Sequence, residues 1–306
     1  MEQKKIAGDL KTLVLPAVLC TALWGSAAPC VKSGYRLFSV AAGDTASQLV
    51  FAGWRFLLAG LLVLLVNGLR GRRVAPKRTE LAPIAALCLF QTILQYICYY
   101  IGLSQTTGVK GSVLSGTQTF FAVLLAHLLL RDDKLTRFKA LGCALGFAGV
   151  VVLNAGGGLG GFSWGDGLVL LSAVSAGAGA LVSRVVTPGR DPMLLTGWQL
   201  AAGGGLLLAF GMARGGALGT VSPAGVALLG YMVVLSAVAF SVWTALLGKF
   251  QVGRVTLFSF CIPVFGAVFS ALVLGETIFT LRNLAALLLV CVGIAAANYT
   301  RAKPAR

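Results

Sequence analysis

Charged residues are scarce in this sequence: they make up only 11% of 306 residues, and nine are Asp or Glu. A soluble domain carries roughly 25% charged residues, so this chain cannot cover a soluble monomer's surface with polar groups. Lipid must be its main solvent, because the mean hydropathy is +0.90 and apolar runs of membrane-spanning length recur from end to end. The sequence therefore predicts an all-α polytopic membrane protein.

Several chemical classes are excluded by what else is missing. The chain has a single histidine, and its seven cysteines lie inside apolar runs without CxxC or Cys/His spacing, so we expect no metal and no cofactor. No Walker motif and no paired aspartates within a span occur either, which makes an intramembrane enzyme the least favoured class. The net charge of +16 lies mostly in short links between apolar runs, which favours lipid headgroups over nucleic acid as its partner.

The apolar runs predict ten transmembrane helices joined by short links. Their expected ranges are about 12–32, 47–67, 81–103, 109–130, 138–155, 165–186, 193–213, 222–248, 254–274 and 280–299. Lys and Arg alternate by link, and one side holds only Lys32, Arg36, Lys110, Arg214 and Arg282. The positive-inside rule then predicts that both termini lie in the cytoplasm of a bacterial inner membrane.

An internal repeat divides the sequence into residues 1–155 and 156–306. At a shift of 144 positions, Gly53-Trp54-Arg55 falls on Gly197-Trp198-Gln199, while Tyr99 falls on Trp243 and Ser115 on Ser259. The first helix needs a slightly larger shift, which places Lys32 on Arg184. Each half holds five predicted spans, so the second half must be inverted in the membrane. Inverted repeats are typical of secondary transporters with a substrate site between the halves.

Three motifs resemble those of the EamA-type drug/metabolite transporters. They are Leu23-Trp24-Gly25-Ser26, Trp54-Arg55-Phe56, and Leu272-Val273-Leu274-Gly275-Glu276 after Pro263. The resemblance covers nearly the whole chain and implies export of small metabolites, often amino acids or related compounds. It also implies a proline in the fourth span, where this chain has Thr119 opposite Pro263. We take Thr119 and Pro263 as gating or hinge candidates and do not assume symmetric gates.

Polar and aromatic residues within the spans are the candidate substrate-binding residues: Trp24, Arg55, Gln91, Gln95, Tyr96, Tyr99, Ser115, Trp243 and Ser259. Gln91, Gln95 and Tyr99 fall at i, i+4 and i+8, so they share one helix face. Such a face either lines a polar cavity or forms hydrogen bonds between helices. The face that carries Ser115 could instead be a close contact between helices, because glycines near it would allow such an approach. Trp24 and Trp243 are expected to lie deeper than an interfacial aromatic belt and could stack on a planar or cationic ligand.

Arg55 is the only charge well inside a predicted span. It could pair with a substrate carboxylate or serve as a structural arginine. We favour the structural role, because the family it resembles places arginine here across very different substrates. No carboxylate lies mid-span, which favours facilitated transport or exchange without a dedicated proton site. The expected partners are a small-molecule substrate and the lipid bilayer, and one chain could function as a monomer. A channel or receptor subunit is the main alternative.

Overall fold

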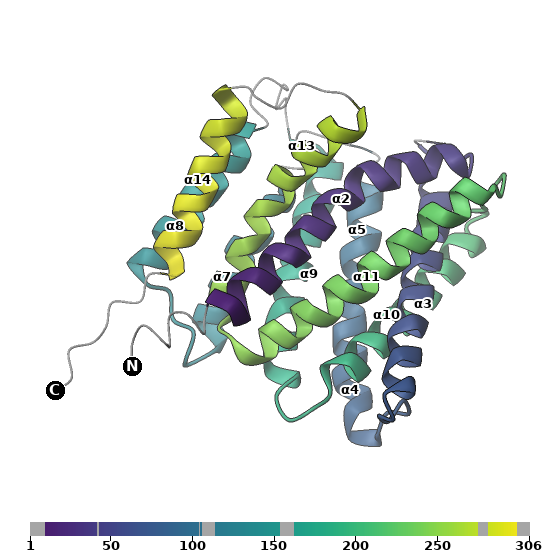
Figure 1. Cartoon of the computed structure of the whole chain (residues 1–306), viewed down its shortest axis with the longest axis horizontal. Helices are drawn as coiled ribbons and strands as arrows, with labels where there is room; N and C mark the ends of the chain where they lie inside the picture. The colour runs from purple at the N-terminus through teal and green to yellow at the C-terminus, as the bar shows by residue number, and fades with distance from the viewer. Residues whose placement is uncertain are drawn as a thin grey trace.

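The computed structural model describes residues 10–41, 43–103, 105, 114–153, 162–274 and 281–298, and helices without any strand make up their regular structure (Figure 1). In the first half they are the π-helix η1 (Leu10–Val14), α2 (Leu15–Leu37), α3 (Thr45–Leu69), α4 (Arg78–Leu87), the π-helix η2 (Cys88–Ile93), α5 (Leu94–Leu103), α7 (Gln118–Leu129) and α8 (Arg137–Leu153). In the second half they are α9 (Trp164–Val186), α10 (Pro192–Ala213), α11 (Pro223–Lys249), α12 (Val252–Thr256), the 3-10 helix η3 (Leu257–Phe260), α13 (Cys261–Leu274) and α14 (Leu281–Asn298).

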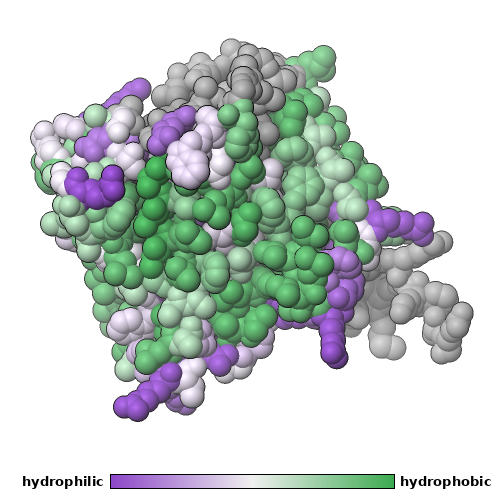
Figure 2. Space-filling model, turned by 180° about the vertical axis from the view of Figure 1, so that it is seen from behind, coloured by the Kyte–Doolittle hydropathy of each residue, from purple (hydrophilic) through white to green (hydrophobic). Residues whose placement is uncertain are grey.

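Six of the helical segments are long and apolar enough to cross a membrane: Thr12–Leu37, Thr45–Leu69, Arg78–Leu103, Trp164–Val186, Pro192–Ala213 and Pro223–Lys249. Leu114–Leu129, Val252–Gly266 and Leu284–Ala296 are shorter apolar helices. Figure 2 shows an apolar band across the molecule, with hydrophilic side chains toward its ends. The predicted all-helical, multi-span membrane fold is confirmed. Each predicted range overlaps a helical segment, while ten crossings and an inverted repeat stay predictions.

Most of the few carboxylates near helix ends act as caps. Asp44 accepts a hydrogen bond from the Ser47 N–H at the start of α3 (3.0 Å), and Asp191 accepts one from the Met193 N–H at the start of α10 (2.9 Å). Asp166 accepts from the Ser163 N–H (2.7 Å) in a capping box at the start of α9. These side chains satisfy backbone donors that a helix leaves unpaired. They are therefore accounted for by local structure.

Helices α3 and α10 pack so closely that glycine is needed at their contact. A Cβ atom at Gly60 would collide with the Ala201 nitrogen, and one at Gly204 would collide with the Leu57 nitrogen. Leu57 and Gly60 lie 144 positions before Ala201 and Gly204, so the same contact is made twice with the halves exchanged. Small residues of this kind let membrane helices approach backbone to backbone.

We expect Gly204→Val to destabilise the protein and Gly205→Val to be tolerated. The first side chain would meet backbone atoms of α3, whereas nothing lies within 4 Å of a Cβ atom at Gly205. Overpacking against backbone should lower the free energy of unfolding by about 3 kcal/mol, which corresponds to roughly 5–10 °C in Tm. Thermal unfolding of both variants in detergent measures the difference. Equal melting temperatures would contradict the close α3–α10 contact.

The helix contacts follow the same exchange of halves. Helix α2 packs against α11 and α13, and α9, its counterpart, packs against α5 and α7. Helix α3 packs along α10, and α8 packs along α14 at one edge of the molecule (Figure 1). Exchanging the first five predicted spans for the second five leaves this set of contacts unchanged. The pattern supports the two-repeat prediction.

Candidate functional site

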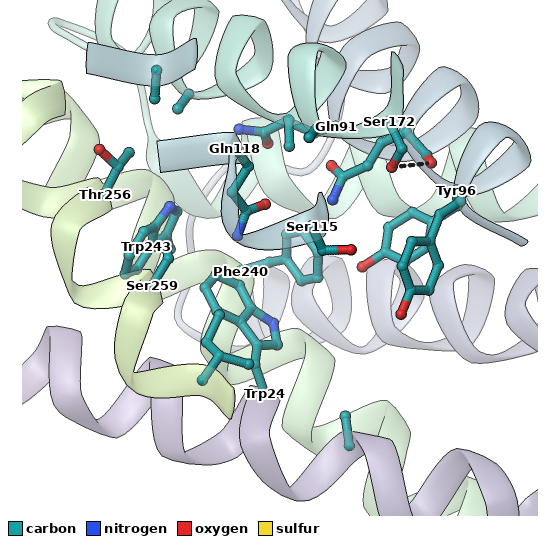
Figure 3. Close-up of a pocket in the computed structure, with 18 of the residues that line it drawn as sticks. Trp24, Gln91, Tyr96, Ser115, Gln118, Ser172, Phe240, Trp243, Thr256 and Ser259 are labelled. Atoms are coloured by element: carbon teal, nitrogen blue, oxygen red, sulfur yellow. Dashed lines mark hydrogen bonds between the residues drawn. The ribbon is translucent and has the colours of Figure 1, made fainter. Parts of the chain in front are cut away.

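A cavity of about 310 Å³ lies between the halves, with walls from α2, α3, α5, α7, α9, α11 and the α12–α13 segment. The residues predicted from the sequence as substrate-binding all line it: Trp24, Arg55, Gln91, Gln95, Tyr96, Tyr99, Ser115, Trp243 and Ser259. Further polar or aromatic lining residues, outside that predicted set, are Tyr100, Gln118, Ser172, Phe240 and Thr256. Figure 3 shows side chains from both halves converging on this space.

Aromatic rings cluster on one side of the cavity. The Trp24 ring lies edge-on to Trp243 (centroids 5.0 Å apart) and to Phe240 (5.5 Å). Figure 3 shows these three side chains together, with Gln91 and Ser172 across from them. Trp24 and Trp243 are therefore held inside the bundle, not in an interfacial belt. The rings form an apolar wall against which a planar group could stack.

The third span, α4–η2–α5, forms a polar wall. The Gln91 amide donates to the Gly179 carbonyl of α9 (3.0 Å), while its Oε1 has no partner among the described residues. The Ser172 hydroxyl donates to the backbone carbonyl of Gln95 (2.8 Å). The π-helix η2 lies in this stretch, and π-helical turns are frequent at functional sites. Gln91 therefore both bonds to a neighbouring helix and lines the cavity, so the two interpretations of this face are compatible.

Arg55 is buried, with 4% of its surface exposed, yet it lines the cavity. Its Nε donates to the Ser236 hydroxyl of α11 (2.7 Å), and its guanidinium carbon lies 5.0 Å from the centre of the Phe56 ring. No Asp or Glu among the described residues forms an ion pair with it. The described cavity wall likewise contains no carboxylate. Arg55 thus brings a positive charge to the cavity that the described wall does not neutralise.

The two hinge candidates lie beside the cavity. Thr119 is fully buried and donates to the Thr256 carbonyl of α12 (3.2 Å), which ties the fourth span to the ninth. Pro263 lies in α13, directly after the 3-10 helix η3, and its side chain is outside the described residues. A proline leaves the carbonyl four residues earlier without its helical donor. That residue is Ser259, which lines the cavity.

A buried ion pair joins the two halves at one end of the bundle. Lys139 of α8 pairs with Asp133, whose second oxygen accepts the Gly253 N–H of α12 (3.1 Å). Lys139 also donates to the Gln251 side-chain carbonyl (3.2 Å). Both charged side chains are almost fully covered, with 6% and 1% of their surfaces exposed. Because nothing in the residue types near Asp133 distinguishes it from a solvated loop carboxylate, this network was not predicted.

Asp132, the residue before Asp133, forms an ion pair with Arg184. Its carboxylate accepts a hydrogen bond from Arg184 of α9 (2.8 Å), and this bond lowers the pKa of Asp132 below its ordinary value. The pair therefore stays ionised at neutral pH. Glu276, which lies 144 positions after Asp132, and Lys110 are outside the described residues. No group of three or more His, Cys, Asp or Glu among the described residues could hold a metal ion.

Taken together, the apolar band, the helical bundle and the cavity with polar and aromatic walls indicate a multi-span membrane transporter. The sequence model of the EamA-like transporter family matches residues 12–155 and again residues 163–299, so the chain belongs to that family. The chain is 27% identical to the inner membrane transporter YedA of Escherichia coli, covering 86% of this chain and 83% of that protein. It is 31% identical to the transporter YvbV of Bacillus subtilis, covering 82% of each. A crystal structure with 18% identity has the same fold, with a TM-score of 0.76, covering 93% of this chain and 95% of the other.

Proposed function

We propose that this protein is a secondary transporter that exports small polar metabolites, such as amino acids or related compounds, by alternating access. The observation that carries this proposal is the cavity of about 310 Å³, which takes its walls from both halves of the chain. A site between repeats can open to either side when one half rocks against the other. The volume is at the lower end of the range of small-molecule sites.

The proposed architecture is two inverted five-helix repeats, residues 1–155 and 156–306. The double match of the family model and the exchanged α3–α10 contacts support a repeat. Inversion follows if each half crosses the membrane five times. With the basic links on one side, we place both termini in the cytoplasm and the protein in the inner membrane. A single chain encloses the cavity, which supports function as a monomer.

Uptake by proteoliposomes tests the function. The full-length protein is reconstituted and given a pooled, isotope-labelled metabolite mixture, with and without a pH gradient, and the contents are read by mass spectrometry. We expect saturable uptake of one compound class that does not require the gradient, because no carboxylate lines the described cavity wall. No uptake by folded protein would favour a receptor subunit, and single-channel currents would favour a channel.

Tyr99→Ala and Gln95→Ala should each lower uptake by about tenfold or more with folding intact. Removing one polar contact worth about 1.4 kcal/mol reduces affinity tenfold, and both side chains line the cavity. Leu89→Ala is the matched control, because Leu89 lies in the same span and is 46% exposed on the outer surface. Wild-type uptake by both cavity variants would contradict the assignment of this face.

A further inference from the structure

The charge of Arg55 exceeds what helix packing requires. At the shift of 144 positions, Arg55 corresponds to Gln199 and its partner Ser236 corresponds to Thr92. Gln199 donates to the Thr92 hydroxyl (3.1 Å), just as Arg55 donates to the Ser236 hydroxyl (2.7 Å). The same bond between helices is therefore made in one half by a neutral amide and in the other by a guanidinium. A neutral side chain is sufficient for the structural role.

Arg55 and Gln199 also differ in whether they line the cavity. Gln199 is fully buried and does not line the cavity, whereas Arg55 does. Ser236 is the only hydrogen-bonding partner of Arg55 among the described residues, and it uses the Nε atom. Both terminal nitrogens therefore remain to bind a ligand. A buried charge is costly unless it is paired, and a carboxylate would pair with this guanidinium through two hydrogen bonds.

The two halves also differ in polarity around the cavity. Gln91, Gln95 and Gln118 line it from the first half, and their counterparts at the shift of 144 are Leu235, Ala239 and Ile262. The two tyrosines likewise correspond to less polar residues in the second half, since Tyr96 and Tyr99 fall on Phe240 and Trp243. The cavity thus has a polar side that includes Arg55 and an apolar side built on Phe240 and Trp243. Such a cavity suits a ligand with one charged end and one apolar end.

The aromatic side could in principle attract a cation instead. The Arg55 guanidinium lies 5.0 Å from the Phe56 ring, and the Phe56 ring lies 6.0 Å from the Phe240 ring, so Arg55 is within about 11 Å of the Phe240 ring. At an effective dielectric constant near 20, a like charge at about 11 Å weakens binding by roughly tenfold. That repulsion is comparable to the gain expected from one cation–π contact. The charge balance therefore favours an anion.

Resting on the proposed transport function, we propose that the substrate is a small organic acid carrying one net negative charge. Its carboxylate pairs with Arg55, and its apolar part, best a planar ring, lies against Phe240 and the neighbouring tryptophans. The Arg55 guanidinium lies 5.0 Å from the Phe56 ring, whose centre is 6.0 Å from that of Phe240. A ligand with a short linker between its carboxylate and its ring could therefore reach from Arg55 to Phe240. The substrate class is thus narrowed from polar metabolites in general to monoanionic acids.

Four probes with one phenylalkyl body test the charge preference: 3-phenylpropanoate, 3-phenylpropanamide, 2-phenylethylamine and phenylalanine. Binding to the purified full-length protein is measured by isothermal titration calorimetry at neutral pH. We expect the propanoate to bind at least about tenfold more tightly than the amide and the amine, with phenylalanine between them. Equal or tighter binding of the amide or amine overturns the proposal. Binding of none at about 10 mM also overturns it, while saturable uptake from the metabolite pool would leave the transport function standing.

Substitutions at Arg55 test whether this residue causes the preference for the propanoate over the amide. Arg55→Gln installs the side chain that makes the equivalent bond in the second half, so the bond to Ser236 can be kept. We expect the propanoate-to-amide ratio to fall to near one, and Arg55→Lys to restore part of it. Arg214→Gln, the control, removes the same charge from an exposed position at the end of α10 and should leave the ratio unchanged. An unchanged propanoate-to-amide ratio in folded Arg55→Gln overturns the pairing of the carboxylate with Arg55. If that variant does not fold, the four probes measured on the wild-type protein still decide the charge of the substrate.

Discussion

Replacing Ala176 with phenylalanine should stop transport, reducing uptake by about 100-fold or more while the protein stays folded. Ala176 lies on α9 and lines the cavity. Phenylalanine adds roughly 100 Å³ of side chain to a space of about 310 Å³. The shift that aligns Lys32 with Arg184 also places Trp24 on Ala176. The second half therefore has a small side chain where the first half has a large one. The small side chain of Ala176 leaves space on this wall of the cavity.

The control for this variant is Val185→Phe on the same helix. Val185 is 59% exposed on the outside of the bundle, so a larger side chain there would extend away from the protein. Its uptake should equal that of the wild type in the same proteoliposome assay, and melting temperatures of both variants should be similar. Wild-type uptake by Ala176→Phe would place the transport path outside this cavity and would remove the basis for the proposed function.

The positions of the helices could be predicted because lipid forces every backbone group to pair within its own helix, which makes long apolar runs decisive. Helix ends were less predictable. The first span was expected to end near residue 32, but α2 continues to Leu37. Lys32 and Arg36 suggested a link there, yet long basic side chains can remain on a helix and extend toward the membrane surface.

Polar site residues were predictable because they contrast with apolar surroundings, as Gln91 and Tyr99 do. Phe240 was missed because an aromatic residue in a mostly apolar helix gives no such contrast, and only its correspondence with Tyr96 marks it. Gln118 lies one turn after Ser115 and could have been found by extending that face. The Ser236 partner of Arg55 could not be inferred without the fold, because 181 positions separate the two residues.

Lys139→Met should destabilise the protein by about 3–5 kcal/mol, the range for removing one partner of a buried ion pair. Methionine would leave the Asp133 carboxylate in a site where 1% of its side-chain surface is exposed. One oxygen would keep the Gly253 N–H, but the other would lose its charged partner. A shift of roughly 10 °C in Tm corresponds to this loss, and thermal unfolding in detergent measures it.

Two further variants separate the buried pair from a general effect of losing positive charge. Lys134 lies in the same loop, is exposed and donates to the His127 carbonyl (2.9 Å), so Lys134→Met should cost less than about 1 kcal/mol. The double variant Lys139→Met with Asp133→Leu removes both charges and should recover most of the lost stability, because apolar replacement of a buried pair is often close to neutral. Because the Gly253 bond is also lost, recovery should be incomplete. If Lys139→Met has the same Tm as the wild type, the ion pair is solvated, and the halves are not joined at this end by a buried charge.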